Sequence, residues 1–241
     1  VYAPLIEEWL VYEFGADTVF NYTCAPYFGD CGDLVSHDGY DYETVQIGEQ
    51  CWFAENCRYL PEVSPSTEES DTDPYYYVYG YEGMDVADAK ATTNYDTYGV
   101  LYNWPAVMTD RICPSGWHIP SDGEWQTMEI SLGMSEAEAA QTGWRGSPVG
   151  DYMKSTSGWN NNGNGSNSSG FNGLPGGFRY SGFFFDNGDG GYWWSASESG
   201  SNSWKRYLNI INDNVLRDDA NRNLGFSARC VRDESGCMVD T

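Results

Sequence analysis

The sequence has few cationic residues. Its 241 residues include 12 Lys plus Arg and 2 His against 36 Asp plus Glu, which gives a formal net charge of -24. Because a surface of that sign repels phosphate backbones, we expect no nucleic-acid partner. The chain also lacks an apolar run near the roughly 20 residues that a membrane-spanning helix needs, so we expect no membrane span. The acidic residues are spread along the whole chain, which is typical of a solvated surface.

Patterns of catalytic residues are equally scarce. The two histidines, His37 and His118, are too few for a histidine-based zinc cluster, and each is expected to be a structural residue. The sequence contains no G-x-S-x-G, no phosphate-binding glycine loop and no H-E-x-x-H. We therefore expect a protein that is not an enzyme and that needs no cofactor.

Seven cysteines are present, and none belongs to a C-x-x-C unit of the kind that holds zinc. The cysteines therefore indicate disulfides formed in an oxidising compartment, and we expect an extracellular or cell-surface location. Cys24 and Cys31 are close in sequence and are predicted to close a small loop. Because seven is odd, one thiol stays unpaired or bonds to another chain. The chain begins at Val1 without a leader, which fits an exported protein whose signal has been removed.

The first 35 residues form an apolar arm that differs from the rest of the chain. Left in water, the arm would expose a larger patch than soluble monomers usually tolerate, so it is expected to cover its own domain or a neighbouring molecule. We divide the chain into this arm (1–35), a central domain (36–234) and a short tail (235–241). The residues predicted to make the arm's contacts are Leu5, Ile6, Trp9, Leu10, Tyr12 and Phe14.

The central domain is predicted to be α+β, with few helices and many short strands, since it is rich in glycine and aromatic residues. Capping boxes open helices at Ser121 and Ser135, and a third helix is expected around 100–108. A hairpin is predicted over 41–53, and strands are predicted over 183–185, 192–197, 204–211 and 226–232, the last quarter being an antiparallel meander. Residues 155–182 form a long Gly/Asn-rich loop region, anchored by Trp159, Phe171 and Phe178.

Several segments, taken together, resemble a known family. They are DGYDYETVQIGEQCWFAENCRYL (38–60), YGVLYNWPAVM (98–108), CPSGWHIPSDGEWQTM (113–128), SSGFNGLPGGFRYSGFF (168–184), GYWWSASES (191–199) and GFSARCVRD (225–233). This set resembles the Fibrobacter succinogenes major paralogous domain, a family of bacterial secreted and surface proteins without an established catalytic role. The helix-start and final-strand segments are also similar to those of C-type-lectin-like and sulfatase-modifying-factor domains.

The resemblance implies a C-type-lectin-like fold and a disulfide between Cys113 and Cys230. It also implies a departure, because Cys57 stands where the family usually has Leu. Cys51 and Cys237 are the candidate partners of Cys57. Sulfatase-modifying factors suggest copper-bound thiolates, but a Cys230 held in a disulfide could not be a reactive thiolate.

Two kinds of surface site are predicted. Asp186 and Asp189 lie in a glycine turn and supply oxygen ligands for a calcium site, and Asp213, Asn214, Asp218 and Asp219 form a second such group. Neither group has the spacing of an EF-hand loop, and turn chemistry is the alternative explanation. Asn21, Asn164 and Asn167 begin N-x-S/T triplets, and Asp17-Thr18-Val19 resembles a bacterial O-glycosylation motif at Thr18.

Two functions remain open at this point. The first is a non-catalytic structural or adhesive subunit that binds copies of itself through the arm and builds an extracellular assembly, such as a filament. The second is a monomeric recognition module that binds a glycan or a surface protein through its loop region and exposed aromatic residues, with calcium as an optional ligand.

Overall fold

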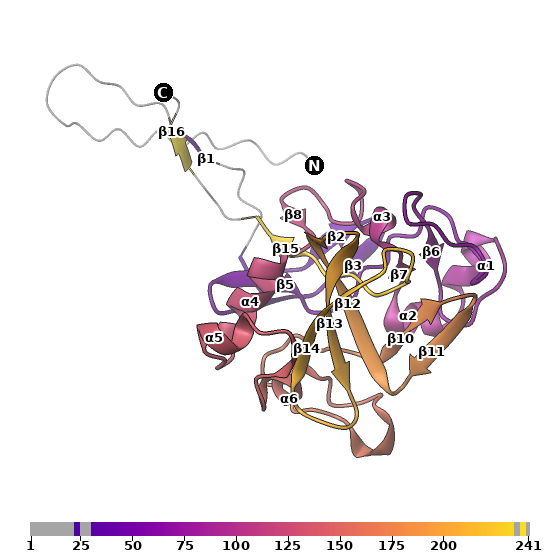
Figure 1. Cartoon of the computed structure of the whole chain (residues 1–241). Coiled ribbons are helices and arrows are strands. Elements are labelled where there is room, and N and C mark those ends of the chain that lie inside the picture. The colour runs from indigo at the N-terminus through magenta and orange to yellow at the C-terminus, as the bar shows by residue number, and fades with distance from the viewer. Residues whose placement is uncertain (1–21, 25–29, 234–236, 240–241) are drawn as a thin grey trace, which may run out of the picture.

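The computed structural model describes residues 22–24, 30–233 and 237–239. In this part the chain is a mixed α+β structure of short helices and mainly antiparallel strands (Figure 1). The expected class is therefore confirmed at this level. None of the described helices has the length and apolar character required to cross a bilayer.

The largest sheet has six strands in the order β11-β10-β12-β13-β14-β9. All neighbours are antiparallel except β10 and β12, which run parallel and meet at Gly177 and Gly191. The antiparallel strands β12, β13 and β14 form its centre; the sequence predicted β12 and β13 as parts of a meander, but not β14. The bounds are β9 Gly143–Arg145, β10 Gly176–Tyr180, β11 Phe183–Asn187, β12 Gly190–Ser199, β13 Asn202–Asn209 and β14 Val215–Ala220.

A second sheet has four short strands in the order β4-β5-β15-β8. The predicted hairpin is present, with Thr44 opposite Phe53 and Ile47 opposite Gln50. The expected strand over 226–232 is shorter than predicted, because residues before Val231 make single bridges to different strands instead of one ladder. The bounds are β4 Thr44–Ile47, β5 Gln50–Phe53, β8 Trp117–His118 and β15 Val231–Arg232.

Three two-stranded pairs complete the described strands. They join β1 (Tyr22–Cys24) to β16 (Cys237–Val239), β2 (Val35–His37) to β3 (Tyr40–Tyr42), and β6 (Tyr76–Tyr77) to β7 (Leu101–Tyr102). In the first pair the backbone register sets Cys24 opposite Cys237.

The helices are short, and their starts follow from local sequence. Ser121 and Ser135 each accept from the third helical N–H while the Glu at that position accepts from the cap, so both predicted capping boxes are confirmed. The helix expected around 100–108 covers four residues, because Pro105 fits only in a first turn. The bounds are α1 Val86–Lys90, α2 Thr93–Tyr98, α3 Trp104–Val107, α4 Asp122–Ser131, α5 Glu136–Ala139 and α6 Val149–Met153.

Two apolar clusters form the core, and ion pairs join α4 to the large sheet. Trp159 and Phe171 are buried in the core, so they anchor the Gly/Asn-rich region.

On α4, the fully buried Glu129 carboxylate accepts from Arg145 and Arg206, and Asp122 accepts from Arg206 and Arg217. These pairs fix the capped helix rigidly against β9, β13 and β14.

Candidate functional site

Two disulfides are present in the described part of the chain. Cys113 is bonded to Cys230, as the resemblance implied, and Cys31 is bonded to Cys51. The predicted Cys24–Cys31 pair is therefore wrong, because the β4–β5 hairpin carries Cys51 to the start of the described domain, where Cys31 lies. The two partners predicted for Cys57 are also wrong.

Cys57 is instead a buried free thiol. Its Sγ lies 3.4 Å from Sγ of Cys230, and the sulfurs of Cys57, Cys113 and Cys230 all lie within 4.8 Å of one another. This is the one group of three or more metal-ligating residues found among the described residues. The sequence marked Cys57 only as a departure from a family pattern, and no local signal revealed its neighbours.

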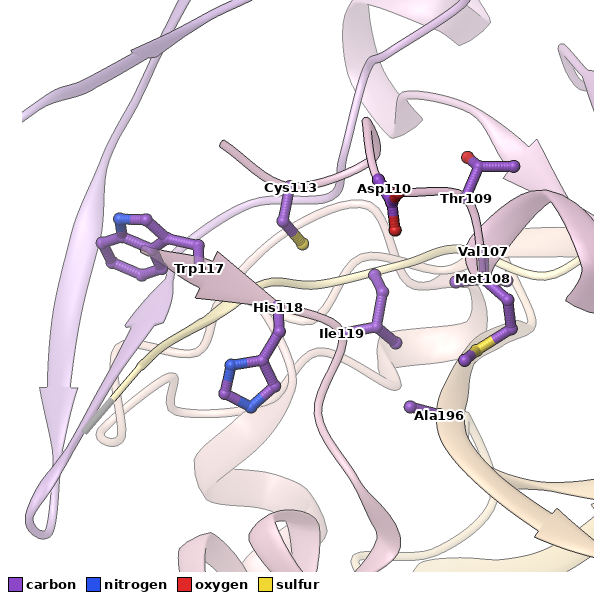
Figure 2. Close-up of a pocket in the computed structure, with 9 residues that line it drawn as sticks. All are labelled: Val107, Met108, Thr109, Asp110, Cys113, Trp117, His118, Ile119 and Ala196. Atoms are coloured by element: carbon purple, nitrogen blue, oxygen red, sulfur yellow. The ribbon is translucent and has the colours of Figure 1, made fainter. Parts of the chain in front are cut away.

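A cavity of about 350 Å³ opens beside the Cys113–Cys230 disulfide. Figure 2 shows its lining, with Met108 and Ala196 on the opposite side from Trp117. The walls are mainly apolar, and Asp110 and His118 supply the ionisable groups. The lining residues are Val107, Met108, Thr109, Asp110, Cys113, Trp117, His118, Ile119 and Ala196.

His118 is held between two carboxylates. Its Nε2 lies 2.7 Å from Oε1 of Glu124, and its Nδ1 bonds Asp233. The hydrogen bond to Glu124 raises the pKa of His118. Burial opposes this rise and the bond to Asp233 reinforces it, so that the pKa is about 9. A histidine that is protonated at neutral pH cannot act there as a general base. His118 ties the first turn of α4 to the residue that follows β15, which is the structural role expected from the sequence.

A partly exposed aromatic face covers the β10–β11 hairpin at the edge of the large sheet, and its Phe178 packs on the buried Tyr192. Tyr180 pairs with Phe183, and Phe178 pairs with Phe185, so all four rings lie on one face of the hairpin. Phe183 is 68 % exposed, Tyr180 48 % and Phe185 39 %. Phe184 points to the other face and packs on Tyr79. We call Phe178, Tyr180, Phe183 and Phe185 the aromatic face.

The sequence predicted only a strand over Phe183 to Phe185, without an exposed face. A signal for the exposed face was nevertheless present, because alternate residues of a strand point to opposite sides. Three consecutive phenylalanines must therefore put aromatic rings on both faces of the sheet.

The two main carboxylates predicted for calcium each accept a hydrogen bond from another side chain. Asp186 accepts from the Tyr192 hydroxyl at 2.6 Å, and Asp189 accepts from Asn160 at 3.0 Å. Of the second group, Asp218 and Asp219 lie within β14. The calcium site stays a prediction, now with its two main carboxylates hydrogen-bonded to neighbouring side chains.

The remaining predicted sites fall on different parts of the chain. Asn164 is exposed in the Gly/Asn-rich region, and Asn167 is half-buried there, with its Oδ1 accepting from the N–H of Asn172. The others lie outside the described residues: glycosylation sites Thr18 and Asn21, and arm contacts Leu5, Ile6, Trp9, Leu10, Tyr12 and Phe14.

Comparison with known proteins decides the family. The family model described as the Fibrobacter succinogenes major domain matches residues 45–232, which is most of the chain. The chain belongs to this family. The matched range of the Fibrobacter succinogenes major domain runs from β4 to β15 and contains the free thiol, the Cys113–Cys230 disulfide, the cavity and the aromatic face. Neither a curated protein nor a solved structure gives a significant match.

Proposed function

We propose that this protein is a non-catalytic, extracellular structural subunit with a C-type-lectin-like fold, and that it assembles with copies of itself through its N-terminal arm. The observation that carries this proposal is the aromatic face of the β10–β11 hairpin. Three of its rings are substantially exposed, two of them on the edge strand β11 and one on β10, and covering them would remove apolar area from water.

The free edge of β11 also supports a contact with the arm. Among the described residues β11 has a strand neighbour on one side only, so its outer backbone groups can pair with an added strand. Residues 1–21 have the composition of such a strand, since they contain Leu5, Ile6, Trp9, Leu10 and Phe14. An added strand contributes main-chain hydrogen bonds, and its alternate side chains contribute apolar contacts to the aromatic face.

Assembly between molecules follows if the arm of one copy contacts the aromatic face of another. A contact between an arm and the hairpin of the next copy is heterologous, and such contacts repeat into a ring or an open filament. The disulfides support a rigid subunit outside the cell.

A monomeric recognition module is the second candidate. The same exposed rings favour it, because aromatic faces also contact sugars and protein partners. A glycan array in the presence of calcium or EDTA tests this candidate, and absence of binding under both conditions excludes the glycan form of it.

Deletion of residues 1–21 tests the proposed assembly. We expect the full chain to form concentration-dependent assemblies by light scattering, and the shortened chain to stay monomeric with an unchanged circular-dichroism spectrum. If both proteins have the same size distribution, the arm does not drive assembly and the proposal fails.

A further inference from the structure

The free thiol of Cys57 contacts a disulfide that contains a more accessible sulfur. The N–H of Cys57 donates to the carbonyl of Ala228 at 2.9 Å, and the N–H of Phe53 donates to the carbonyl of Cys230 at 2.9 Å. The two chain segments therefore run side by side, and the Sγ atoms of Cys57 and Cys230 are in contact at 3.4 Å. Cys230 can accordingly pair with either Cys113 or Cys57 after only a small movement of side chains.

Exposure distinguishes the two sulfurs that compete for Cys230. Cys57 and Cys230 are fully buried, whereas Cys113 is 9 % exposed and lines the cavity. Figure 2 shows the Cys113 side chain at the cavity wall. A Cys57–Cys230 bond would leave Cys113 as the free thiol, so a thiol that is inaccessible in one pairing becomes accessible in the other.

Loop length does not decide between the pairings. Cys113 and Cys230 are 117 residues apart, and Cys57 and Cys230 are 173 apart. The entropy of closing a loop depends on the logarithm of its length, so the two pairings constrain the unfolded chain almost equally. Local packing and the rate of exchange determine which pairing is found.

We propose that Cys113 is a latent covalent attachment site, released when Cys57 replaces it in the disulfide with Cys230. Cys57 loses its proton to solvent, its thiolate bonds to Sγ of Cys230, the Cys113–Cys230 bond breaks, and Cys113 leaves as a thiolate. The Cys113 thiolate then attacks a ligand disulfide and forms a mixed disulfide, and the other half of the ligand leaves as a thiolate that takes up a proton from solvent. The ligand disulfide is the only co-reactant.

The cavity indicates which ligands can attach. Its walls are mainly apolar. Of its ionisable groups, Asp110 is acidic and the protonated His118 is paired with two carboxylates, in a chain whose net charge is -24. Anionic disulfides are therefore repelled, and the class that fits is a small disulfide that is neutral or cationic and carries apolar groups.

Burial explains why the exchange is slow at neutral pH. It raises the pKa of the Cys57 thiol to about 12, and the reacting species is the thiolate. Far below that pKa the thiolate fraction, and with it the exchange rate, grows roughly tenfold per pH unit.

Labelling of the oxidised wild-type chain tests the proposal. The probe is 4,4′-dithiodipyridine, a neutral disulfide whose released thiopyridone is followed by absorbance between pH 7 and 9. Peptide mapping without reduction then locates the label and the disulfides. We expect the label on Cys113 together with a Cys57–Cys230 bond, formed about tenfold faster per pH unit. Label on Cys57 with Cys113–Cys230 retained, or no label on any of the three, overturns the proposal.

Two variants give matched controls. Cys57→Ser lacks the attacking thiol, so Cys113 should stay unlabelled and bonded to Cys230, and labelling of Cys113 in this variant contradicts the mechanism. Cys113→Ser should contain a Cys57–Cys230 disulfide when oxidised and folded. If that folded variant keeps both as free thiols, the alternative pairing does not fit the structure. The wild-type mapping decides the question should this variant fail to fold, and none of these results depends on assembly.

Discussion

Replacing Phe183 by Ser should weaken assembly without unfolding the domain. Phe183 is 68 % exposed, and a fully buried Phe covers about 150–250 Å². Covering the exposed part would thus remove about 100–170 Å² from water, which is worth about 3 kcal/mol at about 25 cal/mol per Å². Since about 1.4 kcal/mol is a factor of ten, the variant's dissociation constant should rise about a hundredfold.

Sedimentation velocity over a concentration series measures this change. Ile211→Ser is the matched control, because Ile211 is 83 % exposed and lies after β13, outside the aromatic face. Both variants should retain the wild-type melting temperature. The reasoning is refuted if Phe183→Ser assembles like the wild type, or if Ile211→Ser weakens assembly to the same extent.

Three further predictions concern charge. Residues 1–21 carry four carboxylates and no Lys or Arg, in a chain of net charge -24. Raising the NaCl concentration should therefore screen the repulsion between copies and strengthen assembly, as measured by light scattering. Weaker assembly at high salt would contradict an apolar contact. Glu129→Gln leaves the Arg145 guanidinium without its buried counter-charge and leaves Arg206 with Asp122 alone. It should lower the free energy of unfolding by about 3–5 kcal/mol in urea, while the exposed Glu136→Gln should not. Because the pKa of His118 is raised to about 9 in the folded protein, its protonation stabilises the fold fully below pH 6.5, and this stabilisation is lost as the pH rises through about 9. His118→Gln should remove this decline in the free energy of unfolding, and His37→Gln should keep it.

Elements with a strong local signal could be predicted from the sequence. The capping boxes at Ser121 and Ser135 located α4 and α5, and aromatic-rich runs bounded by turns located β12 and β13. β14 was missed because Asp213, Asn214, Asp218 and Asp219 indicated oxygen ligands before the last strand. Within β14, Arg217 is buried in a pair with Asp122 of α4, and a partner 95 residues away leaves no local pattern.

The site was less predictable than the fold. The Cys113–Cys230 disulfide followed from a family resemblance, whereas the Cys31–Cys51 pair depends on how the β4–β5 hairpin folds back on Cys31. The contact between Cys57 and Cys230 depends on the same tertiary arrangement. The aromatic face had a sequence signal in its three consecutive phenylalanines, but its exposure follows from the position of β11 at a sheet edge.

Photo-crosslinking from position 183 tests the central claim most directly. The full chain would carry benzoylphenylalanine in place of Phe183 and be assembled from a mixture of ¹⁴N- and ¹⁵N-labelled protein before irradiation. Assembly through the arm predicts crosslinked peptides that join position 183 of one copy to residues 1–21 of another, seen as mixed-isotope pairs. Crosslinks confined to a single isotope, or mixed pairs that reach only other parts of the partner copy, would contradict it.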